Sequence, residues 1–179
     1  MDQIIEEGFI RLTETIQEFG KRKEELDSAI RSDLSSLLSK MAALAAPLVG
    51  SLGNVFLEKS KQDAKGELYN TVHYNSKMIV LGRTDEPVPF RPDDINKRVV
   101  KQFCVLSEDG SIAELMYSDD GFIIDSYLNH LTPEEAIDLY GPDIIYMLYY
   151  AVREYGSMEE ELVQALEITL AFIQQKKDN

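Results

Sequence analysis

Apolar residues recur in alternating steps of four and three through the first fifty residues of the chain, and the positions between them are mostly charged or polar. Steps of this kind place the apolar side chains along one side of a helix. A stripe this narrow has the spacing of a coiled coil and needs a second helix to cover it. The first run occupies Ile5, Phe9, Leu12, Ile16, Phe19, Lys23, Leu26 and Ile30. After one extra step of four, the rhythm resumes at Leu34, Leu37, Met41, Leu44 and Leu48.

This pattern predicts a helix over residues 2–46 that ends before Pro47. A helix of about 45 residues spans roughly 68 Å, whereas a compact chain of this size is about 40 Å across. The helix therefore either protrudes and pairs with another chain or folds back as a hairpin at Gly20. Because the apolar steps keep their phase across Gly20, a continuous or kinked helix is favoured. The predicted interface of a homo-oligomer, with a dimer favoured, consists of Ile5, Phe9, Leu12, Ile16, Phe19, Leu26, Ile30, Leu34 and Leu37.

Residues 41–57 carry no charge. Pro47, Gly50, Gly53 and Asn54 interrupt this segment, so a membrane span is a weak interpretation. The end of the first helix, a turn and a second short helix are expected here. A polar junction follows at Lys59, Lys61, Gln62, Asp63 and Lys65. It divides the chain into a helical oligomerisation region, residues 1–58, and an α+β domain with an acidic surface, residues 66–179.

Beyond the junction the apolar period changes to two, which is typical of strands. The expected strands are 67–74, 77–82, 98–106, 112–118 and 122–128, with Asn75 and Ser76 as a hairpin turn between the first two. Residues 83–96 contain three prolines and are expected to form a loop. The Asp-Gly steps at Gly110 and Gly121 supply tight hairpins between the later strands. The sequence therefore predicts a five-stranded, mainly antiparallel sheet.

Two to three helices are expected after the sheet. Thr132 begins a capping box with Glu135, and Gly141 ends that short helix. Pro142 and Asp143 begin the next helix, which is apolar on all sides over residues 144–152 and is therefore either buried or shared with another chain. Gly156 is expected to end it, and Ser157 to cap a last helix that reaches residue 175. The fold class is α+β, with helices before and after one sheet.

The net charge of −14 is unevenly distributed. Residues 102–175 hold fifteen acidic residues and a single basic one, Arg153. A surface this negative repels phosphate backbones, so nucleic-acid binding by this part is disfavoured. It is expected to be a solvated surface or, in the sharper interpretation, a patch for a basic protein partner or for divalent cations.

No catalytic motif is visible, and the catalytic residues stay unknown. Cys104 lies within a strand pattern and is expected to be a core thiol. His73 and His130 lie far apart in the sequence and belong to no short metal motif, so neither a metal nor a cofactor is expected. Arg83 and Arg91 flank the proline-rich segment, where they either bind an anion or pair with neighbouring acids.

Assembly is thus indicated more clearly than chemistry. The leading hypothesis is a non-enzymatic, self-associating scaffold protein that presents an acidic α+β domain to a protein partner. The acidic start of the chain lacks the basic region of a signal peptide, which favours the cytoplasm. The alternative is a small-molecule sensor or enzyme with a pocket between the sheet and the C-terminal helices.

Overall fold

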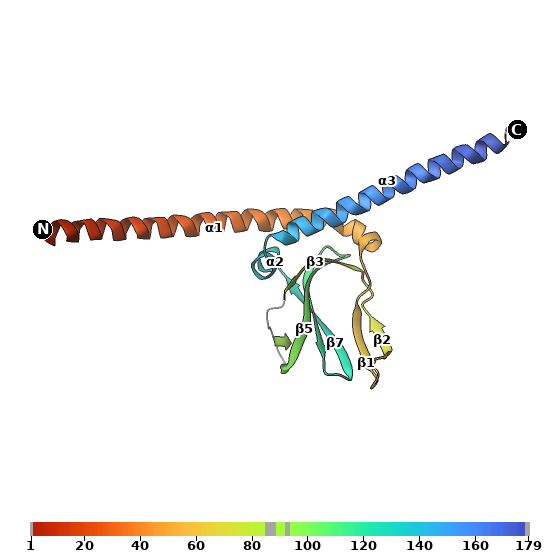
Figure 1. The fold of residues 1–179 in the computed structure, drawn as a ribbon, viewed down its shortest axis with the longest axis horizontal. Helices are drawn as coiled ribbons and strands as arrows, with labels where there is room; N and C mark the ends of the chain where they lie inside the picture. Colours follow the sequence, from red (N-terminus) through yellow and green to blue (C-terminus); the bar gives the residue numbers. More distant parts are fainter. Residues whose placement is uncertain (1, 85–88, 92–93, 178–179) are drawn as a thin grey trace.

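A computed structural model describes the backbone of residues 2–84, 89–91 and 94–177, and the side chains of residues 6–84 and 97–170. It shows an α+β fold with a long N-terminal helix, an antiparallel sheet and C-terminal helices, as the sequence predicts. Helix α1 (Asp2–Leu52) and helix α3 (Asp143–Lys177) cross above one face of the sheet. Both run far past the sheet, and their free ends point in opposite directions (Figure 1). Helix α2 (Pro133–Tyr140) lies at one end of the same layer.

Helix α1 is continuous through Gly20, which excludes the hairpin alternative. The prediction that it ends before Pro47 is wrong, because it continues through that proline to Leu52. A proline inside a helix costs about 3 kcal/mol. That cost is offset here because Val49 is fully buried and Leu52 packs against the same core. No second short helix follows; Leu57 instead begins a strand.

The sheet has the strand order β2-β1-β7-β6-β5-β3, and all its neighbouring pairs are antiparallel. The short strand β4 pairs with β5 outside this path. The strands are β1 (Leu57–Gln62), β2 (Leu68–His73), β3 (Met78–Thr84), β4 (Pro89–Arg91), β5 (Asp94–Ser107), β6 (Ile112–Asp119) and β7 (Ile123–Leu131). The five predicted strands are all present. Strand β1 lies where a polar junction was expected, and β4 lies in the expected loop.

The hairpin predicted at Asn75 and Ser76 is wrong. These residues do connect β2 to β3, but the two strands lie at opposite edges of the sheet. Strand β2 pairs with β1, whose Lys-rich sequence hides its strand character. The hairpins at the Asp-Gly steps are confirmed: Gly110 and Gly121 have φ angles of 80° and 86°, in the left-handed region that glycine adopts without strain.

The short helix α2 begins as predicted, since the Thr132 hydroxyl accepts from the backbone N–H of Glu135 in a reciprocal capping box. The predicted break at Gly156 is wrong, because α3 runs through it without interruption. Ser157 does not cap a helix there; its hydroxyl donates to the carbonyl of Arg153. A helical glycine costs only about 1 kcal/mol, which the strong helix formers on both sides outweigh.

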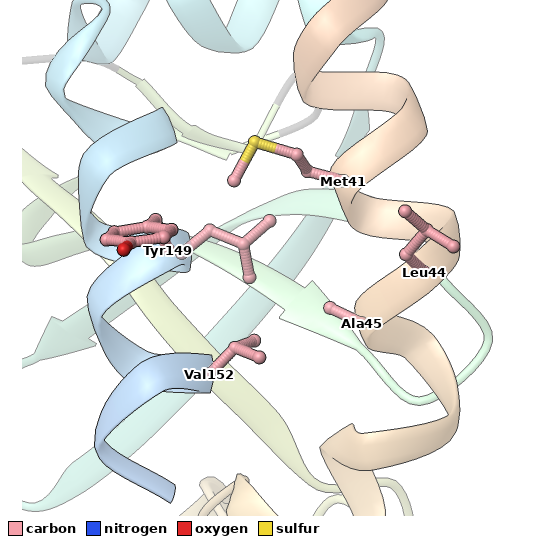
Figure 2. A pocket seen from close by; sticks show the side chains of 6 residues that line it. Met41, Leu44, Ala45, Tyr149 and Val152 are labelled. Carbon is pink, nitrogen blue, oxygen red and sulfur yellow. The ribbon is translucent and has the colours of Figure 1, made fainter. Parts of the chain in front are cut away.

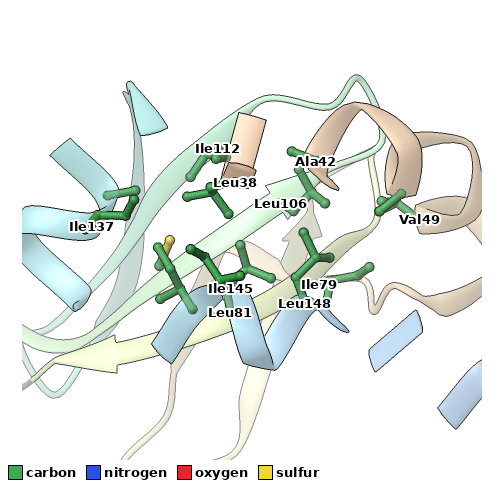
Figure 3. Packing of buried hydrophobic residues seen from close by; sticks show 14 residues of the cluster. Leu38, Ala42, Val49, Ile79, Leu81, Leu106, Ile112, Ile137, Ile145 and Leu148 are labelled. Atoms are coloured by element: carbon green, nitrogen blue, oxygen red, sulfur yellow. The ribbon is translucent and has the colours of Figure 1, made fainter. Parts of the chain in front are cut away.

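Buried apolar side chains form two clusters on the two faces of the sheet. The larger lies between the sheet and the helices and draws on both α1 and α3 (Figure 3); its members include Leu38, Ala42, Val49, Ile79, Leu81, Leu106, Ile112, Ile137, Ile145 and Leu148. The smaller consists of Met78, Val105, Ala113 and Leu115, flanked by Phe56, Tyr74, Phe103 and Tyr117. The middle of the fold is therefore a compact body, from which the ends of α1 and α3 project.

Candidate functional site

The N-terminal stripe, meaning the predicted interface residues from Phe9 to Ile30, is exposed along the whole projecting part of α1. Each of its members is more than half exposed: Phe9, Leu12, Ile16, Phe19, Leu26 and Ile30. Ile5 lies outside the described side chains. A row of large apolar side chains along an otherwise polar helix, left in water, marks a surface for another helix.

The same helix changes role where it reaches the body. There a second stripe, Leu38, Ala42, Ala45 and Val49, is buried against the sheet. It keeps the same steps of four and three, displaced by one position from Leu37, Met41, Leu44 and Leu48. Leu34 packs partly against the core, whereas Leu37 and Leu44 are 46% and 78% exposed. The predicted interface therefore divides, because Leu34 belongs to the body and Leu37 continues the exposed surface.

A shallow apolar groove of about 150 Å³ lies where α1 and α3 cross (Figure 2). Met41, Leu44 and Ala45 line it from α1, and Leu148, Tyr149 and Val152 line it from α3. The all-apolar segment of α3 therefore has two sides. One side lies in the core, where Ile144, Ile145 and Leu148 are buried. The other side is exposed and carries Tyr146, Met147, Tyr149 and Tyr150. The groove joins the exposed surfaces of the two helices.

After its buried segment, α3 carries further exposed apolar residues: Met158, Leu162, Val163, Leu166, Ile168 and Leu170. None of them is among the predicted interface residues. The signal that would have found them is the density of apolar residues after Glu161, in what was predicted as a separate last helix. Both projecting helices therefore expose apolar surface.

The accessible surface quantifies this exposure. The chain exposes 13014 Å² for a mass of 20.3 kDa. A compact monomer of that mass exposes about 8800 Å². The excess is roughly 4200 Å² per chain, or about 8400 Å² for two chains, which exceeds the total of about 2000 to 5000 Å² that many obligate dimer interfaces bury.

A buried polar cluster lies between β5, β6 and the end of α2. Glu114 accepts hydrogen bonds from the side-chain amide of Gln102 and from the Tyr140 hydroxyl, the latter at 2.9 Å. Burial, and then the nearby Glu114 carboxyl group, raises the pKa of the Cys104 thiol to about 12 and also raises the pKa of Tyr140. Cys104 is fully buried and is thus the core thiol that the sequence predicts. A thiol held neutral and away from solvent is a poor nucleophile.

The structure does not bring the two predicted anion-binding arginines together. Arg83 is opposite Phe103 on β5 and Arg91 is opposite Asp94, positions nine residues apart along that strand. At about 3.3 Å per residue this separation is roughly 30 Å. Arg83 is exposed, and the side chain of Arg91 lies outside the described residues. An anion site at these residues stays a prediction.

His73 lies on the edge strand β2 and His130 on β7, and both are exposed. Within the side chains that the structure describes, no three His, Cys, Asp or Glu residues are grouped so that they could hold a metal ion. Asp119 and Asp120 serve the β6–β7 turn, since their side chains accept backbone N–H groups of Gly121, Phe122 and Ile123. The hydrogen bonds from the backbone N–H groups of Ile123 and Phe122 lower the pKa of Asp120.

Two further hollows border the sheet. One, of about 430 Å³, lies between the edge strand β3 and α3, where its lining includes Ile79, Val80, Ala151, Tyr155 and Met158. The other, of about 290 Å³, lies on the opposite face of the sheet; its lining includes Leu57, Val100, Lys101, Phe103 and Tyr117. The first is in the place where the alternative function puts a pocket.

No family model, no curated protein and no solved structure matches this chain. By length and composition alone, the segment Glu6–Leu52 of α1 passes the test for a membrane-spanning helix, which core helices also pass. Four of its residues, Leu38, Ala42, Ala45 and Val49, supply the core of the body. Insertion of that part into a membrane would therefore remove the helix from the sheet that it covers.

Proposed function

We propose that this protein is a non-enzymatic, cytoplasmic scaffold that self-associates through α1 as a dimer and presents its acidic α+β body to a basic protein partner. The observation that carries the proposal is the N-terminal stripe, six large apolar side chains that are each more than half exposed on a projecting helix. Complete burial of such a side chain is worth about 1.5–3 kcal/mol. Covering these six side chains with a second copy would therefore contribute several such increments of free energy to association.

Self-association is tested by the molar mass in solution. Light scattering of the intact chain is expected to give about twice the 20.3 kDa of one chain. Ile16→Glu places a charge in the stripe and should return the mass to that of one chain. Gln17→Glu adds the same charge one position away, at an exposed site off the stripe, and should leave the dimer intact. A wild-type mass of 20.3 kDa at micromolar concentration would refute the proposal.

The acidic residues of 102–175, all of which except Glu114 and Asp125 are exposed, support the partner part of the proposal. Opposite charge speeds encounter and selects partners, and it weakens as salt screens it. A basic protein captured on the immobilised dimer should therefore be released as ionic strength rises. Capture that is equal at low and high salt would remove charge as the basis of recognition.

The second candidate function is small-molecule binding in the hollow of about 430 Å³ between β3 and α3. A ligand at a hundredfold excess over its dissociation constant stabilises a protein by about 2.7 kcal/mol. A thermal-shift screen of metabolite carboxylates and nucleotides is expected to raise the melting temperature only if this hollow is a site. Val80→Glu would then abolish the shift. A screen in which no compound acts leaves the scaffold proposal as the stronger one.

A further inference from the structure

The exposed apolar surface of α1 does not stop where the helix reaches the body. The α1 arm (residues 6–33) projects on one side of the body, and the α3 arm, which is the part of α3 after its buried segment (residues 153–170), projects on the other (Figure 1). The N-terminal stripe of the α1 arm continues along the body as Leu37 and Leu44, which stay exposed. A partner that covered only the arm would therefore leave part of the same surface in water.

The stripe positions of α1 are arranged symmetrically about Ile30. Before Ile30 they lie 4, 7, 11, 14 and 18 residues away, and after it they lie at the same five separations. The matched positions are Leu26 and Leu34, Lys23 and Leu37, Phe19 and Met41, Ile16 and Leu44, and Leu12 and Leu48. A two-fold axis at Ile30 would set each position of one copy opposite its match in an antiparallel second copy.

The body is placed so that two copies can pair in this way. Arg31 forms an ion pair with Asp138 of α2 at 3.2 Å, and Leu34 packs partly against the core, so the body begins just after Ile30. Two bodies related by an axis at Ile30 would therefore lie on opposite sides of that axis. The arm reaches about 36 Å from Ile30 to residue 6, and α1 reaches about 33 Å from Ile30 to Leu52. The arm of one copy is thus long enough to cover the body part of the other copy's α1.

The apolar groove between α1 and α3 lies within the reach of that arm. Met41 and Leu44 form its α1 side, and Tyr149 lies on its α3 side (Figure 2). The positions that match Met41 and Leu44 are Phe19 and Ile16, and both of these side chains are more than half exposed. A second copy would therefore bring two bulky apolar side chains of its arm to the groove.

The distribution of charge favours this antiparallel pairing over a parallel one. Residues 34–54, which lie opposite residues 6–26, carry one charge, that of Lys40. The charged residues of the arm would therefore meet an almost uncharged segment. A parallel dimer in register would instead set Lys23 against Lys23 within the stripe, a pairing that costs stability. In the antiparallel pair Lys23 lies opposite Leu37, where its alkyl chain can cover the leucine while its ammonium group stays in water.

We infer that two copies of this chain pair antiparallel along α1 about a two-fold axis at Ile30, so that the arm of each covers the exposed side of α1 and the groove on the body of the other. This inference rests on the proposed self-association and names the surface that receives the arm. The axis makes the contact occur twice, because each copy supplies one arm and one groove.

Single cysteines test the position of the axis, since the chain's own Cys104 is fully buried. In an antiparallel pair only a residue at the axis faces its own copy. Ile30→Cys should therefore form an interchain disulfide with itself under a copper–phenanthroline oxidant. Ile16→Cys alone and Leu44→Cys alone should not, whereas an equal mixture of these two variants should join position 16 to position 44. Non-reducing gels and peptide mass spectrometry identify the joined positions, with the wild-type chain as the control for Cys104.

A charge on the body side of the contact gives a second measurement. Leu44 lies about 21 Å from Ile30 and outside the arm, yet the inferred dimer uses it twice. Leu44→Glu should raise the dissociation constant of the dimer at least tenfold. Ala43→Glu adds the same charge at the neighbouring exposed position, off the stripe, and should change that constant by less than about threefold. Analytical ultracentrifugation measures both constants, and circular dichroism shows whether the helices persist.

The outcomes separate the inference from the proposal beneath it. A wild-type protein that is a monomer refutes both. A dimer in which Ile16→Cys crosslinks with itself is parallel or has another axis. A dimer in which neither Ile30→Cys nor the mixture forms a disulfide, or in which Leu44→Glu has no effect, does not use the body part of α1. Each of these dimers refutes the axis at Ile30 and leaves self-association through the stripe in place.

Discussion

The two halves of α1 have the same sequence rhythm and opposite surroundings. In residues 34–52 an apolar stripe packs against the sheet, and Leu38 and Val49 are fully buried. In residues 6–33 the same steps of four and three leave Phe9 and Phe19 about two-thirds exposed. The spacing indicates that the helix has an apolar side. It does not indicate whether the chain's own sheet or another molecule covers that side.

The largest effect is expected from truncating one leucine in each half of α1. Leu38→Ala should lower the free energy of unfolding by about 2–5 kcal/mol, because it empties a fully buried site. Leu12→Ala, in the exposed half, should change it by less than about 1 kcal/mol. All nine tyrosines lie at or after Tyr69, so their fluorescence during urea unfolding reports the body and α3 but not the α1 arm.

The measurement needs a low protein concentration, so that association contributes least to stability. Equal losses from the two truncations would mean that the arm is as well packed as the body in the isolated chain, and the comparison would fail.

The second test uses pH, since the body holds a buried ionisable group. The pKa of Cys104 is raised to about 12 from an ordinary value of 9.0. The folded chain keeps this proton where the unfolded chain releases it, so the stabilisation is complete below pH 9 and is lost as pH rises. Between these values stability should fall by up to about 1.4 kcal/mol per pH unit from this group alone.

Comparison with Cys104→Ala isolates that contribution from the titration of other groups. The difference in free energy of unfolding between the two proteins should shift by about 2 kcal/mol from pH 8.5 to 10.5. Parallel pH profiles would show that the thiol is not desolvated.

The third test compares the two predicted helix caps, one in the body and one in the α3 arm. Thr132→Ala should cost about 1 kcal/mol, because the hydroxyl caps α2. Ser157→Ala should cost close to nothing, since Ser157 lies inside α3 and its hydroxyl only returns to the carbonyl of Arg153. The melting temperatures of both variants measure these costs. If Ser157→Ala lowered stability as much as Thr132→Ala, the result would support a helix break at Gly156 with Ser157 as a cap.

The smallest effect is expected at Gly20. A Cβ at Gly20 would meet no atom within 4 Å. Gly20→Ala should therefore stabilise the arm by up to about 1 kcal/mol and raise the helical signal in circular dichroism. A matched change at Gly82 should destabilise, because a Cβ there would lie 3.0 Å from a methyl carbon of Ile144 in the core. Helicity that falls with Gly20→Ala would contradict the continuous helix.

Several elements of the fold were predictable because their signals are local. The Asp-Gly turns at Gly110 and Gly121 need a backbone that glycine supplies, and the Thr132 capping box joins residues three apart. Breaks at Pro47 and Gly156 were predicted from equally local costs, and they failed. The cost of about 3 kcal/mol at Pro47 is offset by the burial of Val49, worth about 1.5–3 kcal/mol, together with the packing of Leu52 against the same core, and the cost of about 1 kcal/mol at Gly156 is offset by the helix formers around it.

Pairing between distant segments was harder to predict. Strand β1 reads as Leu-Glu-Lys-Ser-Lys-Gln, which looks like a linker. It becomes a strand because β7 and β2 flank it, and only its Ser60 is buried. The acid Glu114 stands out in an apolar strand, yet its partners Gln102 and Tyr140 come from other elements. The exposed apolar residues near the end of α3 are visible in the sequence as a dense apolar run. The sequence does not show which side of that helix stays uncovered by the body.

Spacing and composition were enough to predict the α+β class, the helical stripe and its unbroken phase through Gly20, the position of most strands and the acidic second half. These follow from spacing and composition, which are properties of neighbouring residues. The three-dimensional packing was needed to show that Leu38 and Val49, and not Leu37 and Leu44, face the core, and that the projecting ends of α1 and α3 leave the body in opposite directions. Coverage of an apolar face depends on which distant segments pack against it in the native state, and that is a property of the whole fold.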